Sequence, residues 1–137
     1  MNGVANGLYG GDLPNQINTP WIDFSEQSSI VGWSSFTAKR IRYKVVGNIV
    51  YVYFSLEGTS NSTSTTFSLP ILPKLAIAFP FAFHSDNGVY FIGGFGNNIS
   101  TNIITCYKTA SISSTSFTTT WTASGVKTIV GQFFYEI

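Results

Sequence analysis

Few residues in this chain have the types and spacing for acid–base or nucleophilic chemistry, and the histidine comes first. His84 is the single histidine and stands directly before Ser85 and Asp86. A Ser-His-Asp triad needs three groups that converge in space, whereas consecutive residues of a turn point in different directions. We therefore interpret these residues as a polar turn that closes on Asn87 and Gly88, two residue types that tolerate positive φ.

The carboxylates are also poorly placed for catalysis. Hydrolysis of a glycosidic bond uses two carboxylates about 5–10 Å apart in a cleft. Asp23 and Glu26 are close in sequence, but turn capping is the more common role of such residues. A small polysaccharide depolymerase is the enzymatic alternative, and the scatter of the acids argues against it. The six acidic residues are spread over the predicted elements: Asp12, Asp23, Glu26, Glu57, Asp86 and Glu136.

The sequence also shows no motif for a metal site or a phosphate-binding loop. One histidine and one cysteine do not make a zinc set. The glycine-rich segment 91–98 lacks the Lys-Ser/Thr pair and the helix of a phosphate-binding loop. The sequence therefore predicts no enzyme activity and no catalytic, metal-binding or cofactor-binding residue.

Aromatic side chains offer a different chemistry, because exposed rings stack on sugars while Ser, Thr and Asn supply hydrogen bonds. The candidates for such stacking are Trp33, Trp121 and Tyr9. The alternative is burial, which is the usual fate of large aromatics, with Trp21 and Trp33 as framework of the fold. A carbohydrate-binding module without catalytic activity is thus one functional hypothesis.

The composition indicates one folded domain with a shortage of charge. Of 137 residues, 44% are hydrophobic and 9% are charged, against a usual charged share of about 25%. The net charge of +1 argues against a nucleic-acid partner. The longest apolar stretch, Leu75–Phe83, is too short for membrane insertion. With a mean hydropathy of +0.20, a lone copy would expose apolar surface, so we expect a homo-oligomer.

The single cysteine, Cys106, cannot form a disulfide within the chain, which suits folding in a reducing cytoplasm. Its apolar neighbours Ile103 and Ile104 predict a buried, inert thiol. The segment 1–11 has no basic start and no apolar run, so we do not expect it to act as a secretion signal.

The elements that would position any site are strands, and the clearest pair lies within residues 39–57. Alternation with a period of two predicts two strands joined by Gly47-Asn48, a strong hairpin signal. The expected inward residues are Ile41, Tyr43, Val45, Val50, Val52, Phe54 and Leu56. The expected solvent-facing residues of the first strand are Arg40, Arg42 and Lys44.

Similar signals predict strands along the remainder of the chain. Residues 1–20 are rich in Gly, Asn and Pro and predict an extended N-terminal arm. Residues 21–137 predict a single all-β domain, an antiparallel β-sandwich or jelly roll of about nine or ten strands. Turns are expected at 84–88 and 96–98, and loops at 58–64 and 108–116. The expected strands are 21–24, 30–36, 39–46, 49–57, 65–69, 75–83, 89–95, 99–107, 117–122 and 127–137.

Residues 20–73 resemble a known family. Pro20-Trp21 is followed by Gly32-Trp33, by KVVGNIVYVYFSLEG and by FSLP at Phe67–Pro70. This order is similar to the small trimeric β-sandwich head domains of tailed-phage tail-fibre, head-fibre and spike or decoration proteins. The resemblance implies a homotrimer on the virion, assembled in the host cytoplasm, that attaches to other virion proteins through residues 1–20. It also implies binding to a host-surface glycan or protein, and no enzyme activity.

The resemblance carries over no binding residue, so position alone suggests them. Binding residues concentrate on loops held by a rigid scaffold, which points to Asn61, Thr63, Ser113 and Thr115. Two aromatic rows are the candidates for the trimer interface: Phe79, Phe81, Phe83, Phe133 and Tyr135. Trimeric signalling heads like those of tumour necrosis factor or C1q share the architecture, but the lack of a secretion signal favours the virion.

Overall fold

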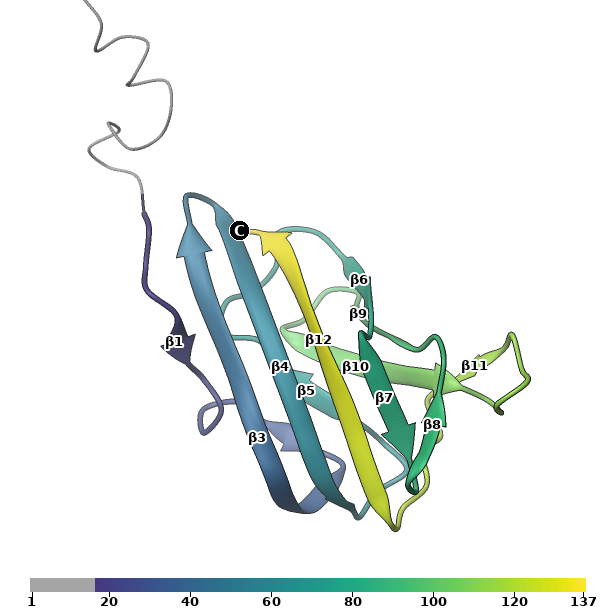
Figure 1. Cartoon of the computed structure of the whole chain (residues 1–137). Helices are drawn as coiled ribbons and strands as arrows, with labels where there is room; N and C mark the ends of the chain where they lie inside the picture. The colour runs from purple at the N-terminus through teal and green to yellow at the C-terminus, as the bar shows by residue number, and fades with distance from the viewer. Residues whose placement is uncertain (1–16) are drawn as a thin grey trace, which may run out of the picture.

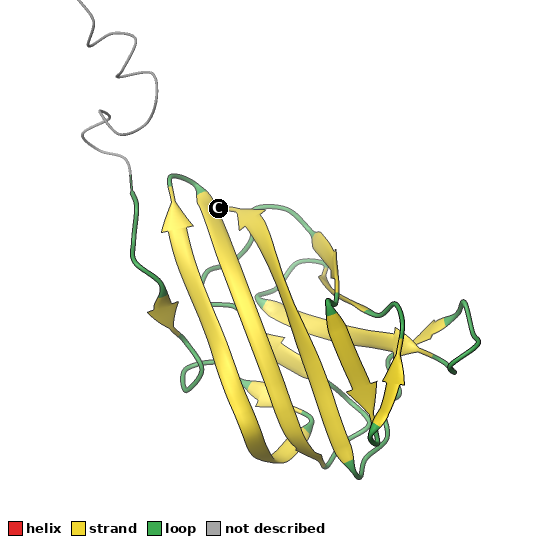
Figure 2. Cartoon of the chain, in the orientation of Figure 1, coloured by secondary structure: helices red, strands yellow, loops and turns green. Residues whose placement is uncertain are grey.

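The computed structural model describes residues 17–137, and their regular structure is entirely β (Figure 2). Most of the predicted arm, residues 1–16, lies outside the described residues. Within the described range no helix is long and apolar enough to cross a membrane. All strand pairs are antiparallel, and the strands form two sheets that pack face to face around one core (Figure 1). The predicted antiparallel sandwich is therefore confirmed.

The two sheets differ in strand length. The long sheet contains, in spatial order, β1 (Ile22–Asp23), β3 (Trp33–Val46), β4 (Ile49–Ser60), β12 (Val126–Glu136), β7 (Phe83–Asp86) and β8 (Val89–Phe91). The short sheet contains β2 (Ile30–Val31), β5 (Thr66–Ser68), β10 (Ile103–Thr109), β9 (Phe95–Asn98) and β6 (Ile77–Pro80), with β11 (Phe117–Thr118) paired to β10. The twelve strands exceed the predicted nine or ten because several pieces of two to four residues are too short to show a period.

The predicted central hairpin is the β3–β4 pair, which turns at Gly47 with a φ of 58°. Its inward set is confirmed, since Ile41, Val50, Phe54 and their neighbours on that face are buried and Tyr43 is half-buried. Residues 33–46 form one strand instead of two, because two register shifts near Ser35 and Ala38 absorb the break in alternation without ending the pairing. The chain before β1 also joins this sheet, with an isolated bridge between Asn18 and Val46.

The predicted element boundaries between residues 75 and 107 are wrong, and the strand expected at 89–95 ends at Phe91, with Phe95 beginning β9. The stretch 75–83 is not one strand, because β6 belongs to the short sheet and β7 to the long sheet. It is apolar on both faces because Phe79 and Phe81 both enter the core where the chain crosses between sheets. Pro80 ends β6, an edge strand, as its missing N–H requires.

The predicted turns also shift. Residues 84–86 lie in β7, so the turn is confined to Asn87-Gly88, where both φ angles are positive. Residues 96–98 lie in β9, and the chain reverses at 99–102 instead. Gly96 serves close packing and not a turn, since a Cβ there would lie 2.5 Å from the Phe79 ring, and Asn98 accepts a hydrogen bond from the Ile77 backbone N–H.

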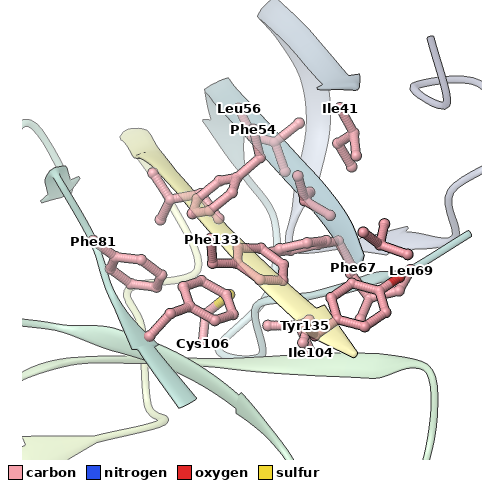
Figure 3. Close-up of a cluster of buried hydrophobic side chains, with 14 of the residues drawn as sticks. Ile41, Phe54, Leu56, Phe67, Leu69, Phe81, Ile104, Cys106, Phe133 and Tyr135 are labelled. Carbon is pink, nitrogen blue, oxygen red and sulfur yellow. The ribbon is translucent and has the colours of Figure 1, made fainter. Parts of the chain in front are cut away.

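The core is centred on Phe54, which is fully buried (Figure 3). Its ring lies 5.2 Å from that of Phe67 and 5.7 Å from that of Phe79, both from the opposite sheet. Gly131 leaves the space that the Phe54 ring occupies, because a Cβ at Gly131 would lie 2.6 Å from that ring. Burial of one such aromatic side chain contributes about 1.5–3 kcal/mol, so this cluster holds the two sheets together.

Candidate binding surface

The outer face of the long sheet carries a row of exposed aromatic side chains. Trp21 is 48% exposed, Tyr51 is 43% exposed and Phe134 is 67% exposed. Tyr51 and Phe134 are register partners on β4 and β12, and their ring centroids lie 6.0 Å apart. Trp21 directly precedes β1 and lies on the same face, where its ring contacts Arg42. We call these three residues the aromatic row.

An open groove of about 590 Å³ is lined by this row and reaches past β12 to residues 78–80 of β6, in the other sheet. Gln132 contributes the polar side chain of a lining that is otherwise apolar. The volume lies within the range of small-ligand sites, about 300–1,000 Å³, which are mainly apolar with a few polar groups. The lining residues are Trp21, Tyr51, Val52, Ala78, Phe79, Pro80, Gln132, Phe133 and Phe134.

Arg42 lies beside Trp21 at the border of the groove. The alternation predicted a solvent-facing residue, but the Arg42 side chain is only partly exposed. Its guanidinium carbon lies 5.6 Å from the centroid of the Trp21 ring and 5.2 Å from that of the Tyr53 ring. The arginine is half-buried, and its buried Nε has no hydrogen-bond partner. Arg40 is exposed as predicted, and Lys44 is half-buried.

The carboxylate beside Arg42 belongs to Asp23, and it is hydrogen-bonded to a residue close to it in the sequence. Asp23 accepts hydrogen bonds from the Ser25 backbone N–H at 2.9 Å and from the Ser25 hydroxyl at 2.6 Å. These bonds, followed by the charges of Arg40 and Arg42, lower the pKa of Asp23. Glu26 pairs instead with Lys39, at 2.9 Å. The two acids therefore cap a turn and form a surface ion pair, and they do not face each other across a cleft.

A second exposed patch lies on β7, on β8 and on the residue after β8. Its side chains are apolar except for the Tyr90 hydroxyl. Phe83 is 42% exposed, Val89 is 41%, Tyr90 is 67% and Ile92 is 81%. The rings of Phe83 and Tyr90 lie 5.2 Å apart. A hollow of about 330 Å³ is lined by residues of both strands, with Phe83, Tyr90 and Ile92 among them. We call Phe83, Tyr90 and Ile92 the β8 patch; Val89 lies on the other face of β8, opposite Asp86. Because β8 is an edge strand, the patch borders unpaired backbone groups.

The predicted interface rows fall mainly inside the chain. Phe79 and Phe133 stack at 3.8 Å within the core, and Phe81 is buried beside them. Tyr135 is buried and donates its hydroxyl hydrogen to the Ile71 carbonyl at 2.8 Å. These four residues hold the two sheets together and have almost no surface to offer a second subunit. Of the five predicted residues, Phe83 alone is exposed.

The predicted receptor loops are exposed but lie in different places. Asn61 and Thr63 follow the end of β4, where the Trp121 backbone N–H bonds to the Thr63 carbonyl at 2.9 Å. Ser113 and Thr115 lie in the loop between β10 and β11, which projects from the side of the sandwich (Figure 1). The fold does not bring the two pairs together into one site.

The structure decides between stacking and burial for the tryptophans: Trp33 is framework, as the burial alternative predicted, whereas Trp21, the other expected framework residue, is exposed. Trp33 and Trp121 are 7% and 1% exposed, and their indole N–H groups bond to the Lys127 and Cys106 carbonyls, both at 3.0 Å. They are framework and cannot stack on a sugar, whereas Trp21 is exposed. Tyr9 lies outside the described residues. No sequence signal separated the three tryptophans, because all lie near strand ends.

A buried ionic network, which sequence reasoning missed, lies where the ends of the sheets meet. Lys127 is fully buried between the Trp33 and Trp121 rings, 5.1 and 5.5 Å from their centroids. Its ammonium donates to the Gly32 and Ser62 carbonyls at 3.1 Å and to the Thr65 hydroxyl at 2.9 Å. All three donors are satisfied, so this lysine is a structural cross-link. Burial lowers its pKa to about 8.

The ion pair of this buried region joins Asp86, which the predicted turn had placed on the surface, to Lys108. Asp86 accepts from the Lys108 ammonium at 2.5 Å and from the Thr122 backbone N–H at 3.0 Å. Both charged residues are buried. Cys106 is buried nearby as predicted, and burial raises the pKa of its thiol. Across residues 17–137 no group of three His, Cys, Asp or Glu residues is arranged to hold a metal ion.

We expect His84 to make the domain sensitive to acid. The residue is 1% exposed, its Nε2 has no partner, and it lies among the rings of Phe81, Phe91 and Trp121. Burial and then the Lys108 charge lower its pKa to about 4. Between pH 6.5 and 4 the unfolded chain binds a proton that the folded chain does not, so stability is full above pH 6.5 and falls as the pH drops.

We expect His84 to contribute about 3 kcal/mol of this loss between pH 6.5 and 4. Urea denaturation at several pH values measures it, and His84→Phe, which keeps a ring among rings, is the comparison. The variant should lose less stability than the native protein over this range. Equal losses in both proteins would show that the carboxylates alone account for the acid sensitivity.

A scan against protein-family models and a search of curated proteins found no match to this chain.

Proposed function

We propose that this chain is a non-enzymatic structural protein of a virion, a homotrimeric fibre-head, head-fibre or decoration domain. In this proposal residues 1–20 attach the domain to other virion proteins, and the sandwich presents its surface to a receptor on the host. The resemblance of residues 20–73 to phage head domains supports the virion assignment. The observation that carries the assembly is the β8 patch, because exposed apolar clusters on small domains commonly mark interfaces.

The β8 patch suits contact between subunits better than the aromatic row does. It contains no charged residue, whereas the aromatic row lies beside Arg42 and Lys44, whose charges would lose hydration at a subunit contact. Phe83, the one exposed member of the predicted interface rows, belongs to this patch. We therefore place the subunit contact along β7 and β8.

The solution mass tests this assembly. Size exclusion with light scattering is expected to give a mass near three times 14.9 kDa. Tyr90→Lys combined with Ile92→Lys should yield folded monomers, because two exposed apolar side chains become like charges at the contact. Ile112→Lys is the matched control, since Ile112 is 67% exposed but lies in the β10–β11 loop, and it should stay trimeric. A monomeric native protein would contradict the proposal.

The second candidate function is a monomeric carbohydrate-binding module. The groove along the aromatic row favours it, because exposed rings and a polar side chain line a shallow open surface. A native monomer that retains sugar binding would replace the virion proposal with this one.

A further inference from the structure

We propose that the groove along the aromatic row binds an acidic saccharide chain, with sugar rings on Trp21, Tyr51 and Phe134 and a carboxylate of the ligand at Arg42. This inference names the ligand class of the receptor-binding role and rests on the proposed function for its biological setting. The site itself needs only one chain.

The shape of the site suits a chain of sugars more than a single small ligand. The row crosses from β1 to β12 over three strand spacings, about 14 Å in total. The groove is a shallow open surface, as the exposure of its three rings shows. Flat apolar ring faces match the C–H faces of pyranose rings, and Gln132 offers an amide to hydroxyl groups.

The charges beside the row indicate an anionic ligand. Arg40, Arg42 and Lys44 follow one another on the outer face of β3, and within residues 17–137 none has a carboxylate within 4.0 Å. Asp23 is the register partner of Arg42, but its oxygen already accepts two hydrogen bonds from Ser25. The edge of the groove therefore has more cationic than anionic groups, which attracts a negative partner.

Arg42 is the residue best prepared for a carboxylate. The Trp21 and Tyr53 rings hold its guanidinium from two sides, which limits the side-chain freedom that binding would otherwise remove. Its buried Nε lacks an acceptor in the protein, although buried polar groups are nearly always paired. Asp23 offsets part of the local charge, but a partly desolvated guanidinium that forms no ion pair within residues 17–137 gains from an anionic acceptor.

A glycan array tests the proposal with the full-length chain. The array should carry chains with uronic or sialic acids beside neutral chains of the same length, and retention is expected on acidic chains. Titration with a retained chain should then show about tenfold weaker binding for Arg42→Gln, which removes the charge but keeps an amide. Trp21→Ala and Phe134→Ala should weaken binding by about tenfold each, since each removes a stacking surface.

Phe117→Ala is the matched control, because Phe117 is 48% exposed, as Trp21 is, but lies outside the groove. Its affinity should equal that of the native protein. Phe134→Ala keeps the test informative if Trp21→Ala perturbs the fold, because Phe134 is 67% exposed. A circular dichroism spectrum of each variant verifies folding.

Several results would overturn the proposal: no retention of acidic chains, retention of neutral chains alone, or affinities that Arg42→Gln and Phe134→Ala leave unchanged. Tighter binding to a thymidine 12-mer than to any acidic glycan would assign the same surface to single-stranded nucleic acid instead. The solution mass of the same sample separates the two proposals. A trimer without glycan binding refutes this inference alone, whereas a monomer that binds acidic glycans refutes the assembly alone.

Discussion

Val52→Asp is expected to leave the chain unfolded or at the margin of folding at 25 °C. Val52 is 1% exposed in the middle of β4, with Tyr43 and Phe133 as its register partners on either side. No cation faces it there, so the carboxylate would be buried without a partner or would have to bind a proton. The cost is about 3–5 kcal/mol or more, a large part of the stability of about 5–15 kcal/mol that small domains have.

Thermal melting followed by circular dichroism measures this effect. Ser55→Asp is the matched control, because Ser55 lies on the outer face of the same strand as the register partner of Arg40. The control should melt within a few degrees of the native protein, since surface substitutions change stability by about 0.5 kcal/mol or less. A Val52→Asp protein that melts with the control would mean that the other face of β4 is inside.

Asp86→Ala is expected to lower the free energy of unfolding by about 3–5 kcal/mol. The substitution leaves the Lys108 ammonium buried without its carboxylate, and it also removes the acceptor of the Thr122 N–H and hydroxyl. Removal of one partner of a buried ion pair is costly because the remaining charge keeps its desolvation penalty. Urea denaturation at pH 7 gives the value.

Two further variants test whether the loss of stability in Asp86→Ala comes from the unpaired buried charge or from the loss of other contacts. Asp86→Leu with Lys108→Met removes both charges and should recover most of the lost stability. Glu26→Ala breaks the exposed pair with Lys39, in which the glutamate side chain is 79% exposed, and should cost about 0–1 kcal/mol. A double variant as unstable as Asp86→Ala would show that the hydrogen bonds from Thr122, and not the unpaired Lys108 charge, make Asp86 necessary.

The sequence predicted well wherever the controlling interactions are local. Alternation in residues 39–57 identified the hairpin and its buried face, because each side chain's face depends only on the backbone period. The turns at Gly47 and at Asn87-Gly88 were predicted for the same reason, since positive φ is a local property of the residue type.

The prediction was wrong wherever partners are distant in the sequence. The alternation of its strand places Lys127 on the inward face. A buried lysine is tolerated there because its ammonium donates a hydrogen bond to the carbonyl of Gly32, 95 residues away in the sequence. Asp86 sits in a stretch of turn-forming residue types, and Lys108, 22 residues away, draws it into the interior. Neither pair leaves a signal in a single sequence.

The sequence by itself therefore determined that the chain is all-β, where its main hairpin turns and which side chains of that hairpin share a face. The tertiary structure alone decided which aromatic side chains are core and which are surface. A period of two separates the faces of a strand but does not say what covers them. The short sheet covers Phe133 of the long sheet, and the long sheet covers Phe79 of the short sheet, while no element of residues 17–137 covers Trp21, Phe134 or Tyr90. That difference in coverage, and not residue type, makes the aromatic row a candidate binding surface.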